Sequence, residues 1–182
     1  SALSFFFGVD YFDNQHQEIM REGTPLVTMM PLWFQQNDEY DKLCQSFVPT
    51  IRAVGKGDLK SEEWTGSIDG LMSQVILCDQ LSRNRFRGTE AAFQYDSVAE
   101  RLTLQLIEEY QKKPDDRSLP GEFYPPYMSS LVLPLMHSEV VANHDLGVEF
   151  LDSSLQELEV STASKKLEGT KYFLLDHKKV LD

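Results

Sequence analysis

Residues 67–88, SIDGLMSQVILCDQLSRNRFRG, decide the fold that we predict for this chain. In the first half, apolar residues recur at the spacing of one helical face: Ile68, Leu71, Met72, Val75 and Ile76. We predict a helix that begins at Thr65 or Ser67 and ends at Leu81, followed by a loop over Ser82–Gly88. Its apolar face requires a neighbouring element to cover it.

Helical spacing also appears on both sides of this stretch. Further helices are predicted over residues 37–55, 97–113, 122–136 and 138–151. Pro49 lies inside the first of these and should kink it, because proline removes one backbone hydrogen bond. No stretch alternates apolar and polar residues as a half-buried strand does. Short connections favour antiparallel neighbours, so we predict an all-α fold of stacked antiparallel helical hairpins.

The 182 residues fit one domain, and 41% hydrophobic content with 11 Phe is enough to build a core. We predict a single helical domain over residues 1–182. Its parts are an N-terminal segment and connection (1–36), a main helical array (37–151), a variable loop (152–170) and a last helix (171–182). Residues 1–36 are expected to hold at most short helices, near Leu3–Phe7 and Gln15–Arg21.

The net charge of −12 disfavours several classes of partner. Non-specific nucleic-acid binding needs a basic stripe, and anionic membrane surfaces repel an acidic protein. No apolar run is long enough to span a bilayer, so membrane contact is expected only through partner proteins. An acidic surface instead selects basic patches on protein partners.

Cys44 and Cys78 each lie within a predicted helix, among apolar neighbours. They are predicted to be free buried thiols, which indicates a reducing intracellular compartment. The sequence opens at Ser1 without a basic leading segment. Cytoplasm and organelle (plastid or mitochondrion) both remain open.

Asp79 continues the apolar face of the predicted central helix, where a lone carboxylate is costly. Arg83 follows four positions later, at the spacing that brings an acid and a base together on one helical face. Arg85 and Arg87 add two further charges. One interpretation is structural: the arginines cap the helix carbonyls and hold the loop. The other is an anion pocket, since arginine forks suit carboxylate and phosphate. The structural interpretation is favoured, because ion-pair networks shift pKa values without being active sites.

A second cluster contains His137, Ser138, Glu139 and His144. On one continuous helix the two histidines would lie about 10 Å apart, too far to bind one metal ion together. We therefore predict no metal site, and no cofactor. Ser138 lacks the glycine-flanked elbow of a nucleophilic serine, so we predict that it caps a helix.

The chain resembles the bacterial domain-of-unknown-function family nine-two-four along nearly its whole length. The segments that carry this resemblance are residues 3–8 (LSFFFG), Trp33-Phe34 with Asp41, residues 57–59 (GDL) with Trp64, 77–89 (LCDQLSRNRFRGT), 92–96 (AFQYD), 133–139 (LPLMHSE) and 176–179 (DHKK). The resemblance implies a tetratricopeptide-like, right-handed superhelical array.

The resemblance implies no reaction, because the family has no assigned one. It places Asp79, Arg83, Asn84, Arg87, His137 and Glu139 at positions that match the family's motifs. The family usually has Phe-Pro where this chain has Leu81-Ser82, and this departure is expected to loosen the loop. The family also continues past the last helix into an aromatic segment.

Two functions follow from these observations. The first is a non-catalytic helical interaction module, a peripheral subunit of a larger, organellar assembly and not an enzyme. The second is a small-molecule enzyme or anion-binding domain. In the second, Asp79, Arg83, Asn84 and Arg87 would bind, and His137 and Glu139 are the catalytic candidates. It requires an imidazole nitrogen of His137 within about 8 Å of the nitrogens of Arg83 or Arg87.

Overall fold

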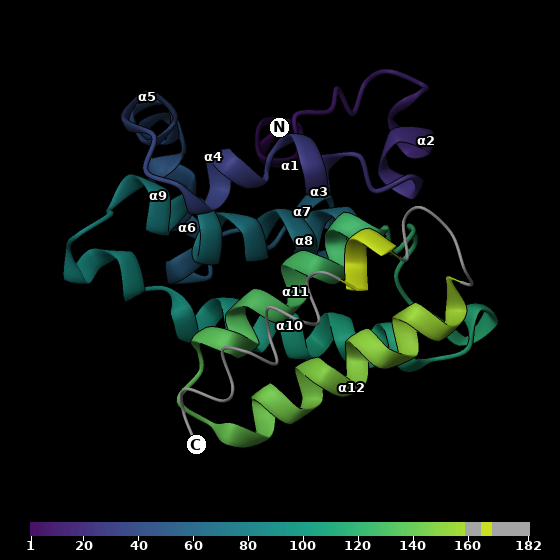
Figure 1. Cartoon of the computed structure of the whole chain (residues 1–182). Coiled ribbons are helices and arrows are strands. Elements are labelled where there is room, and N and C mark those ends of the chain that lie inside the picture. The colour runs from purple at the N-terminus through teal and green to yellow at the C-terminus, as the bar shows by residue number, and fades with distance from the viewer. Residues whose placement is uncertain (159–164, 169–182) are drawn as a thin grey trace.

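The computed structural model describes residues 1–158 and 165–168. Over these residues the chain is helical, with turns and no strand (Figure 1). The α-helices are α1 (Ala2–Phe7), α2 (His16–Arg21), α3 (Pro25–Thr28), α4 (Met30–Phe34), α5 (Asp38–Leu43), α6 (Val48–Lys56), α7 (Glu62–Thr65), α8 (Ile68–Ile76), α9 (Ser82–Arg85), α10 (Asp96–Gln111), α11 (Pro125–His137) and α12 (Val141–Glu157). The 3₁₀ segments are η1 (Cys44–Phe47), η3 (Glu90–Phe93) and η4 (Pro114–Asp116), and η2 (Leu77–Leu81) is a π-helical turn. The all-α prediction is confirmed for this part of the chain.

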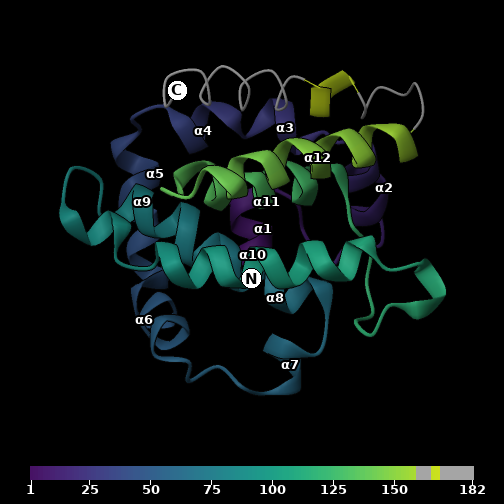
Figure 2. The same cartoon turned by 90° about the horizontal axis from the view of Figure 1, so that it is seen from below.

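α8 lies at the centre of the molecule and packs against α1, α7, α10 and α11 (Figures 1 and 2). It begins where the hydroxyl oxygen of Ser67 accepts a hydrogen bond of 3.0 Å from the N–H of Gly70. Gly70 also lets α7 approach closely, because a Cβ there would lie 2.6 Å from the carbonyl oxygen of Glu63. All five residues of the predicted apolar face are buried.

The predicted helix over residues 37–55 is divided into α5, η1 and α6. Pro49 lies in the first turn of α6, where its missing N–H leaves no hydrogen bond unmade. The side chain of Asn37 caps α5 by accepting a hydrogen bond from the N–H of Tyr40 at 2.9 Å. The proline therefore marks the start of a new helix and does not kink a longer one.

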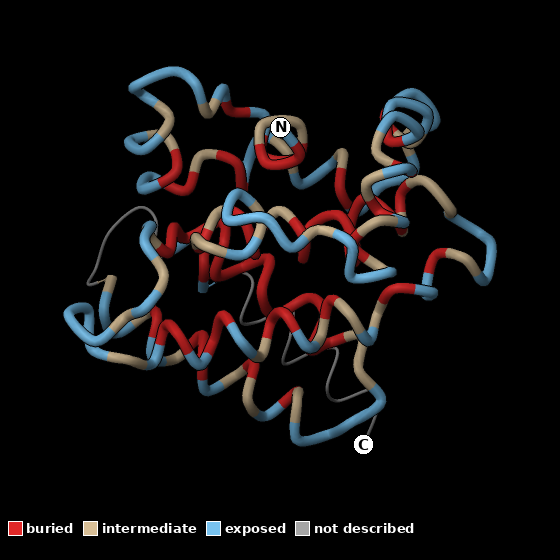
Figure 3. Tube along the Cα trace, turned by 180° about the vertical axis from the view of Figure 1, so that it is seen from behind, coloured by how far each residue is buried: buried red, intermediate tan, exposed pale blue. Residues whose placement is uncertain are grey.

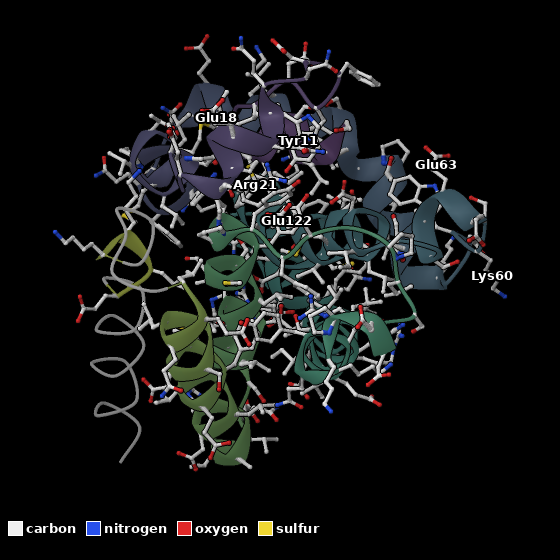
Figure 4. The ribbon with its side chains drawn as sticks, turned by 90° about the vertical axis from the view of Figure 1, so that its right-hand side faces the viewer. Tyr11, Glu18, Arg21, Lys60, Glu63 and Glu122 are labelled. Atoms are coloured by element: carbon white, nitrogen blue, oxygen red, sulfur yellow. The ribbon has the colours of Figure 1, made fainter. Side chains whose placement is uncertain are left out.

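The N-terminal segment is more structured than the predicted connection over residues 1–36. It forms four short helices, α1 to α4, of which α3 and α4 were not predicted. Trp33 stacks on Phe6 with a ring separation of 4.4 Å, and its Nε1 donates to the Phe6 carbonyl. On the face shown in Figure 4, Arg21 and Glu122 point toward each other and form an ion pair of 2.6 Å.

The last two described long helices, α11 and α12, pack against each other, and α11 also packs against α10. Residues 125–136 of α11 are all buried, and buried residues gather along the centre of the molecule (Figure 3). α12 continues to Glu157, so the connection predicted over residues 152–170 begins later than expected. The helix predicted over residues 171–182 lies outside the described residues.

Cys44 and Cys78 are free and buried, as predicted. Burial raises the pKa of each thiol to about 12, so neither is a reactive thiolate near neutral pH. None of the helices in the described part of the chain is long and apolar enough to cross a membrane.

Candidate functional site

The helix that carries Asp79 does not end before Ser82, because a π-turn extends it into α9. The N–H of Ser82 donates to the carbonyl oxygen of Leu77, five residues earlier. The prediction of a loop over Ser82–Gly88 is therefore wrong for Ser82–Arg85, which form α9. The departure from the family at Leu81-Ser82 falls within this helical stretch and not in a loop.

This wider turn changes which side chains face the interior. Residues 77–82 are all buried, whereas an amphipathic α-helix would expose part of each turn. Among them is Asp79, whose side chain is only 1% exposed. Single π-turns inside α-helices occur frequently at functional sites.

The carboxylate of Asp79 accepts hydrogen bonds from three side chains. His137 Nδ1 lies 2.7 Å from its Oδ1, and Arg83 Nε lies 3.4 Å from the same atom. The side-chain amide of the adjacent Gln80 donates to the other oxygen, Oδ2. The predicted pairing of a buried Asp79 with Arg83 is thus present in the structure, and His137 from the end of α11 completes the cluster.

Arg83 has a second acidic partner, Asp96, at the start of α10. Its Nη2 donates to Asp96 Oδ2 at 2.8 Å. Its guanidinium carbon also lies 5.0 Å from the centre of the Phe93 ring, within the range of a cation–π contact. Arg83 therefore links the π-turn to the start of α10, and its charge is shared between two carboxylates.

A depression of about 410 Å³ opens beside this cluster, and we call it the His137 pocket. Its volume falls within the range of small-molecule sites. It is lined by Arg83, Phe93, Asp96, Met136, His137, Ser138, Glu139, Val141 and His144. Asp79 lies behind the lining, in contact with His137.

Burial and neighbouring charges act in opposite directions on the two carboxyl groups. Burial alone would raise the pKa of Asp79, but the charge and hydrogen bond of His137, together with Arg83, hold it below its usual range. Burial raises the pKa of Asp96, and the charge of Asp79 adds to that rise despite the opposing effect of Arg83. Asp79 is consequently the ionised partner of His137.

The other two predicted binding residues, Asn84 and Arg87, turn away from this pocket. Asn84 Nδ2 lies 3.1 Å from Asp41 Oδ1. Arg87 donates two hydrogen bonds to the same carboxylate, one of 2.8 Å from Nε and one of 3.3 Å from Nη2. They line a second depression, between α5 and α9, so the predicted binding set is divided between two places.

Glu139 is exposed at the rim of the His137 pocket, within reach of solvent. The hydroxyl of Ser138 accepts hydrogen bonds from the N–H of Val140 and from Asn143 Nδ2. The N-cap of α12 is Val140, two residues after Ser138. The prediction that Ser138 caps this helix is therefore wrong. Its hydroxyl is occupied locally and is not positioned as a nucleophile beside His137.

The sequence patterns did not assign roles to Asp41 and Asp96, although both lie in segments that resemble the family. They also gave no sign of a part-buried chain of side-chain hydrogen bonds. Tyr127 Oη donates to Asp69 Oδ1 at 2.9 Å, and Tyr11 Oη lies 2.9 Å from Tyr127 Oη. These residues are far apart in sequence, so no local spacing could have revealed them.

The arrangement around His137 suits proton transfer. An ionised carboxylate only accepts hydrogen bonds, so in the neutral form of the imidazole the single proton lies on Nδ1, facing Asp79. Nε2, on the other side of the ring, is then the basic nitrogen, and it has no partner within residues 1–158 and 165–168. In the same residues no group of three His, Cys, Asp or Glu side chains is arranged to hold a metal ion.

Comparisons with known proteins place the chain in a family without assigning it an activity. No curated protein and no solved structure matches it. A family model does match, over residues 5–182, and its description is "Bacterial protein of unknown function (DUF924)". The chain therefore belongs to this family, as the resemblance of its motifs predicted.

Proposed function

We propose that this chain is a small-molecule enzyme in which His137, oriented by Asp79, acts as a general acid or base. The observation that carries the proposal is the 2.7 Å contact between His137 Nδ1 and the buried carboxylate of Asp79. A carboxylate in this position selects one tautomer of the imidazole and stabilises the imidazolium that forms when Nε2 takes a proton. The His137 pocket supplies the space for a substrate.

The charges of the pocket favour a neutral or cationic substrate over an anionic one. Arg83 is the residue of the pocket lining that always carries a positive charge, and two carboxylates already share it. An anion would have to displace Asp96 and approach Glu139. The expectation of an anion pocket around Arg83 is therefore not supported by these contacts.

The lining also favours a substrate with an apolar part. Phe93, Met136 and Val141 contribute apolar surface to the pocket, and Phe93 and Val141 are more than half exposed. Apolar walls around a few polar groups are typical of small-molecule sites. Glu139 at the rim can contact a cationic or hydroxyl group of the substrate.

A metabolite extract tests the proposal even though the substrate is unidentified. The wild-type chain and the His137→Asn variant are each incubated with the extract, and mass spectrometry records which compounds are consumed. His16→Asn is the matched control, because His16 lies outside the His137 pocket. We expect a compound that the wild type and the control consume and His137→Asn leaves unchanged.

Consumption of that compound should fall by about 10²-fold or more in His137→Asn, the usual contribution of a positioned acid or base. Thermal unfolding of both variants checks that they remain folded. Equal consumption by His137→Asn, or no compound consumed by the wild type from any extract, would contradict the proposal.

The second candidate is the helical interaction module, and exposed apolar side chains favour it. Phe93, Val140 and Val141 are 61%, 52% and 58% exposed, and all three lie at or beside the His137 pocket. Exposed apolar residues that gather in one place mark contact surfaces. The proposed tetratricopeptide-like superhelical array, and a place in a larger organellar assembly, belong to this candidate.

Purification of the chain from its native source separates the two candidates. A constitutive subunit is expected to elute with its partner, at a mass well above that of the 20.9 kDa chain. Elution as a monomer would contradict constitutive assembly and leave the enzymatic proposal standing.

A further inference from the structure

We infer that the depression between α5 and α9 binds the phosphate group of a small molecule. This depression, which we call the Arg85 pocket, has a volume of about 390 Å³. It is lined by Gln36, Asp38, Asp41, Lys42, Gln45, Asn84, Arg85 and Arg87. It is distinct from the His137 pocket, with which it shares no lining residue.

The charge of the Arg85 pocket is opposite to that of the whole chain. Three basic and two acidic residues line it, so the lining carries one positive charge, whereas the chain carries a net charge of −12. The fixed charges here attract an anion to a surface that otherwise repels it.

Two of the three basic groups are not neutralised. Arg85 and Lys42 form no ion pair within the described residues, whereas Arg87 is held by Asp41. Asp41 in turn also accepts from Asn84, so its two oxygens are occupied. The charges of Arg85 and Lys42 therefore remain available to a ligand.

The guanidinium of Arg85 is held in a defined position. Its Nε donates to the side-chain oxygen of Gln45, and its carbon lies 5.5 Å from the centre of the Phe86 ring. These contacts leave its two terminal nitrogens without a partner in the described part of the chain. A guanidinium that is already ordered loses less freedom when it binds an anion.

Phosphate matches this arrangement better than a carboxylate does. A phosphate monoester carries about −1.5 to −2 charges at pH 7 and three acceptor oxygens. The unpaired charges of Arg85 and Lys42 and the side-chain amide of Gln45 fit that charge and those oxygens, whereas the amide of Gln36 already donates to Asp38 Oδ1 at 3.1 Å. A pocket of about 390 Å³ is also larger than one phosphate group, which leaves room for the organic part of an ester.

Titration with inorganic phosphate tests this site in the full chain. Two-dimensional NMR spectra are recorded at constant ionic strength, because added salt screens exposed charges. Saturable shifts are expected in the amides of residues 36–45 and 84–88, with little response elsewhere. Acetate is the comparison anion, and it should bind at least about tenfold more weakly because it carries one charge.

Variants identify the groups that bind. Arg85→Gln and Lys42→Gln should each weaken phosphate binding by about tenfold, the effect expected when one charged contact is lost. Arg52→Gln is the matched control, since Arg52 is an exposed basic residue outside the Arg85 pocket. Shifts that do not saturate, equal binding by Arg85→Gln, or equal affinity for acetate would each overturn the inference. None of these results bears on His137.

Discussion

Asp79 and Asp41 each hold an arginine from the same stretch of the chain, in very different surroundings. Asp79 is 1% exposed and accepts hydrogen bonds from Arg83, His137 and Gln80. The side chain of Asp41 is 16% exposed, and that of its partner Arg87 is 36% exposed. The Arg87–Asp41 pair has the shorter contact, with 2.8 Å between Arg87 Nε and Asp41 Oδ2. The distance from Arg83 Nε to Asp79 Oδ1 is 3.4 Å.

The difference shows that burial, and not distance, decides what each pair does. Arg87 and Asp41 remain partly exposed to water, so their pairing contributes less to stability. Asp79 is shielded from water, and each of its hydrogen-bond partners offsets part of the large desolvation cost of its charge. The same burial orients His137, which is why the buried carboxylate is the one we associate with chemistry.

Loss of Arg83 should have the largest effect. We expect Arg83→Ala to lower the free energy of unfolding by about 3 kcal/mol, because it leaves the buried charge of Asp79 with fewer partners. Denaturant unfolding at pH 7 measures the change. Arg52→Ala, at an exposed position, is the control. A change within about 0.5 kcal/mol would mean that Asp79 does not depend on Arg83.

The second-largest effect that we expect is the contribution of Asp79 to the pH dependence of stability. Its pKa in the folded state lies below its usual range, so its contribution is present above the unfolded pKa of about 3.9 and is lost as pH falls through the folded value. In this pH range unfolding lets the Asp79 carboxylate bind a proton, and the Asp79→Asn variant has no carboxylate there to bind one. The slope of unfolding free energy against pH below about pH 4 should therefore be shallower by up to about 1.4 kcal/mol per unit.

Urea unfolding at a series of acid pH values gives both slopes. Asp41→Asn is the natural comparison, because it removes the carboxylate of the more exposed pair. Identical acid slopes for the wild type and Asp79→Asn would show that folding does not lower the pKa of Asp79.

Loss of Arg87 should have the smallest effect. We expect Arg87→Ala to change the free energy of unfolding by less than about 1 kcal/mol, because its ion pair is partly exposed to water. The measurement is the same denaturant unfolding used for Arg83→Ala. A loss as large as that of Arg83→Ala would refute the distinction between the buried and the exposed pair.

Much of the site near Asp79 could be predicted, because its signal is local. The apolar face that ends in Asp79, and the arginine four positions later, both follow from the helical period. The π-turn could not be predicted, since one extra residue in a turn leaves no mark on a short pattern. This is why the sequence wrongly predicts a loop where the chain from Ser82 to Arg85 is helical.

The sequence also could not predict that the binding residues are divided between two pockets. Arg83 and Arg87 are four positions apart, a spacing that suggests one helical face, but α9 ends between them at Arg85. Arg83 therefore points to Asp96 and Arg87 to Asp41. Which acid each arginine meets depends on how α5 and α10 pack, and no short-range pattern encodes that packing.

The amino-acid sequence alone determined that this chain is helical and that Asp79 must be buried beside a base, since both follow from the periodicity of apolar residues within one helix. Only the tertiary structure decided that His137, 58 positions away, would share that carboxylate. α11 packs against α8 and α10, and α10 also packs against η2, which brings the two residues together. Contacts at such separations arise from the joint burial of several helices, a property of the whole fold.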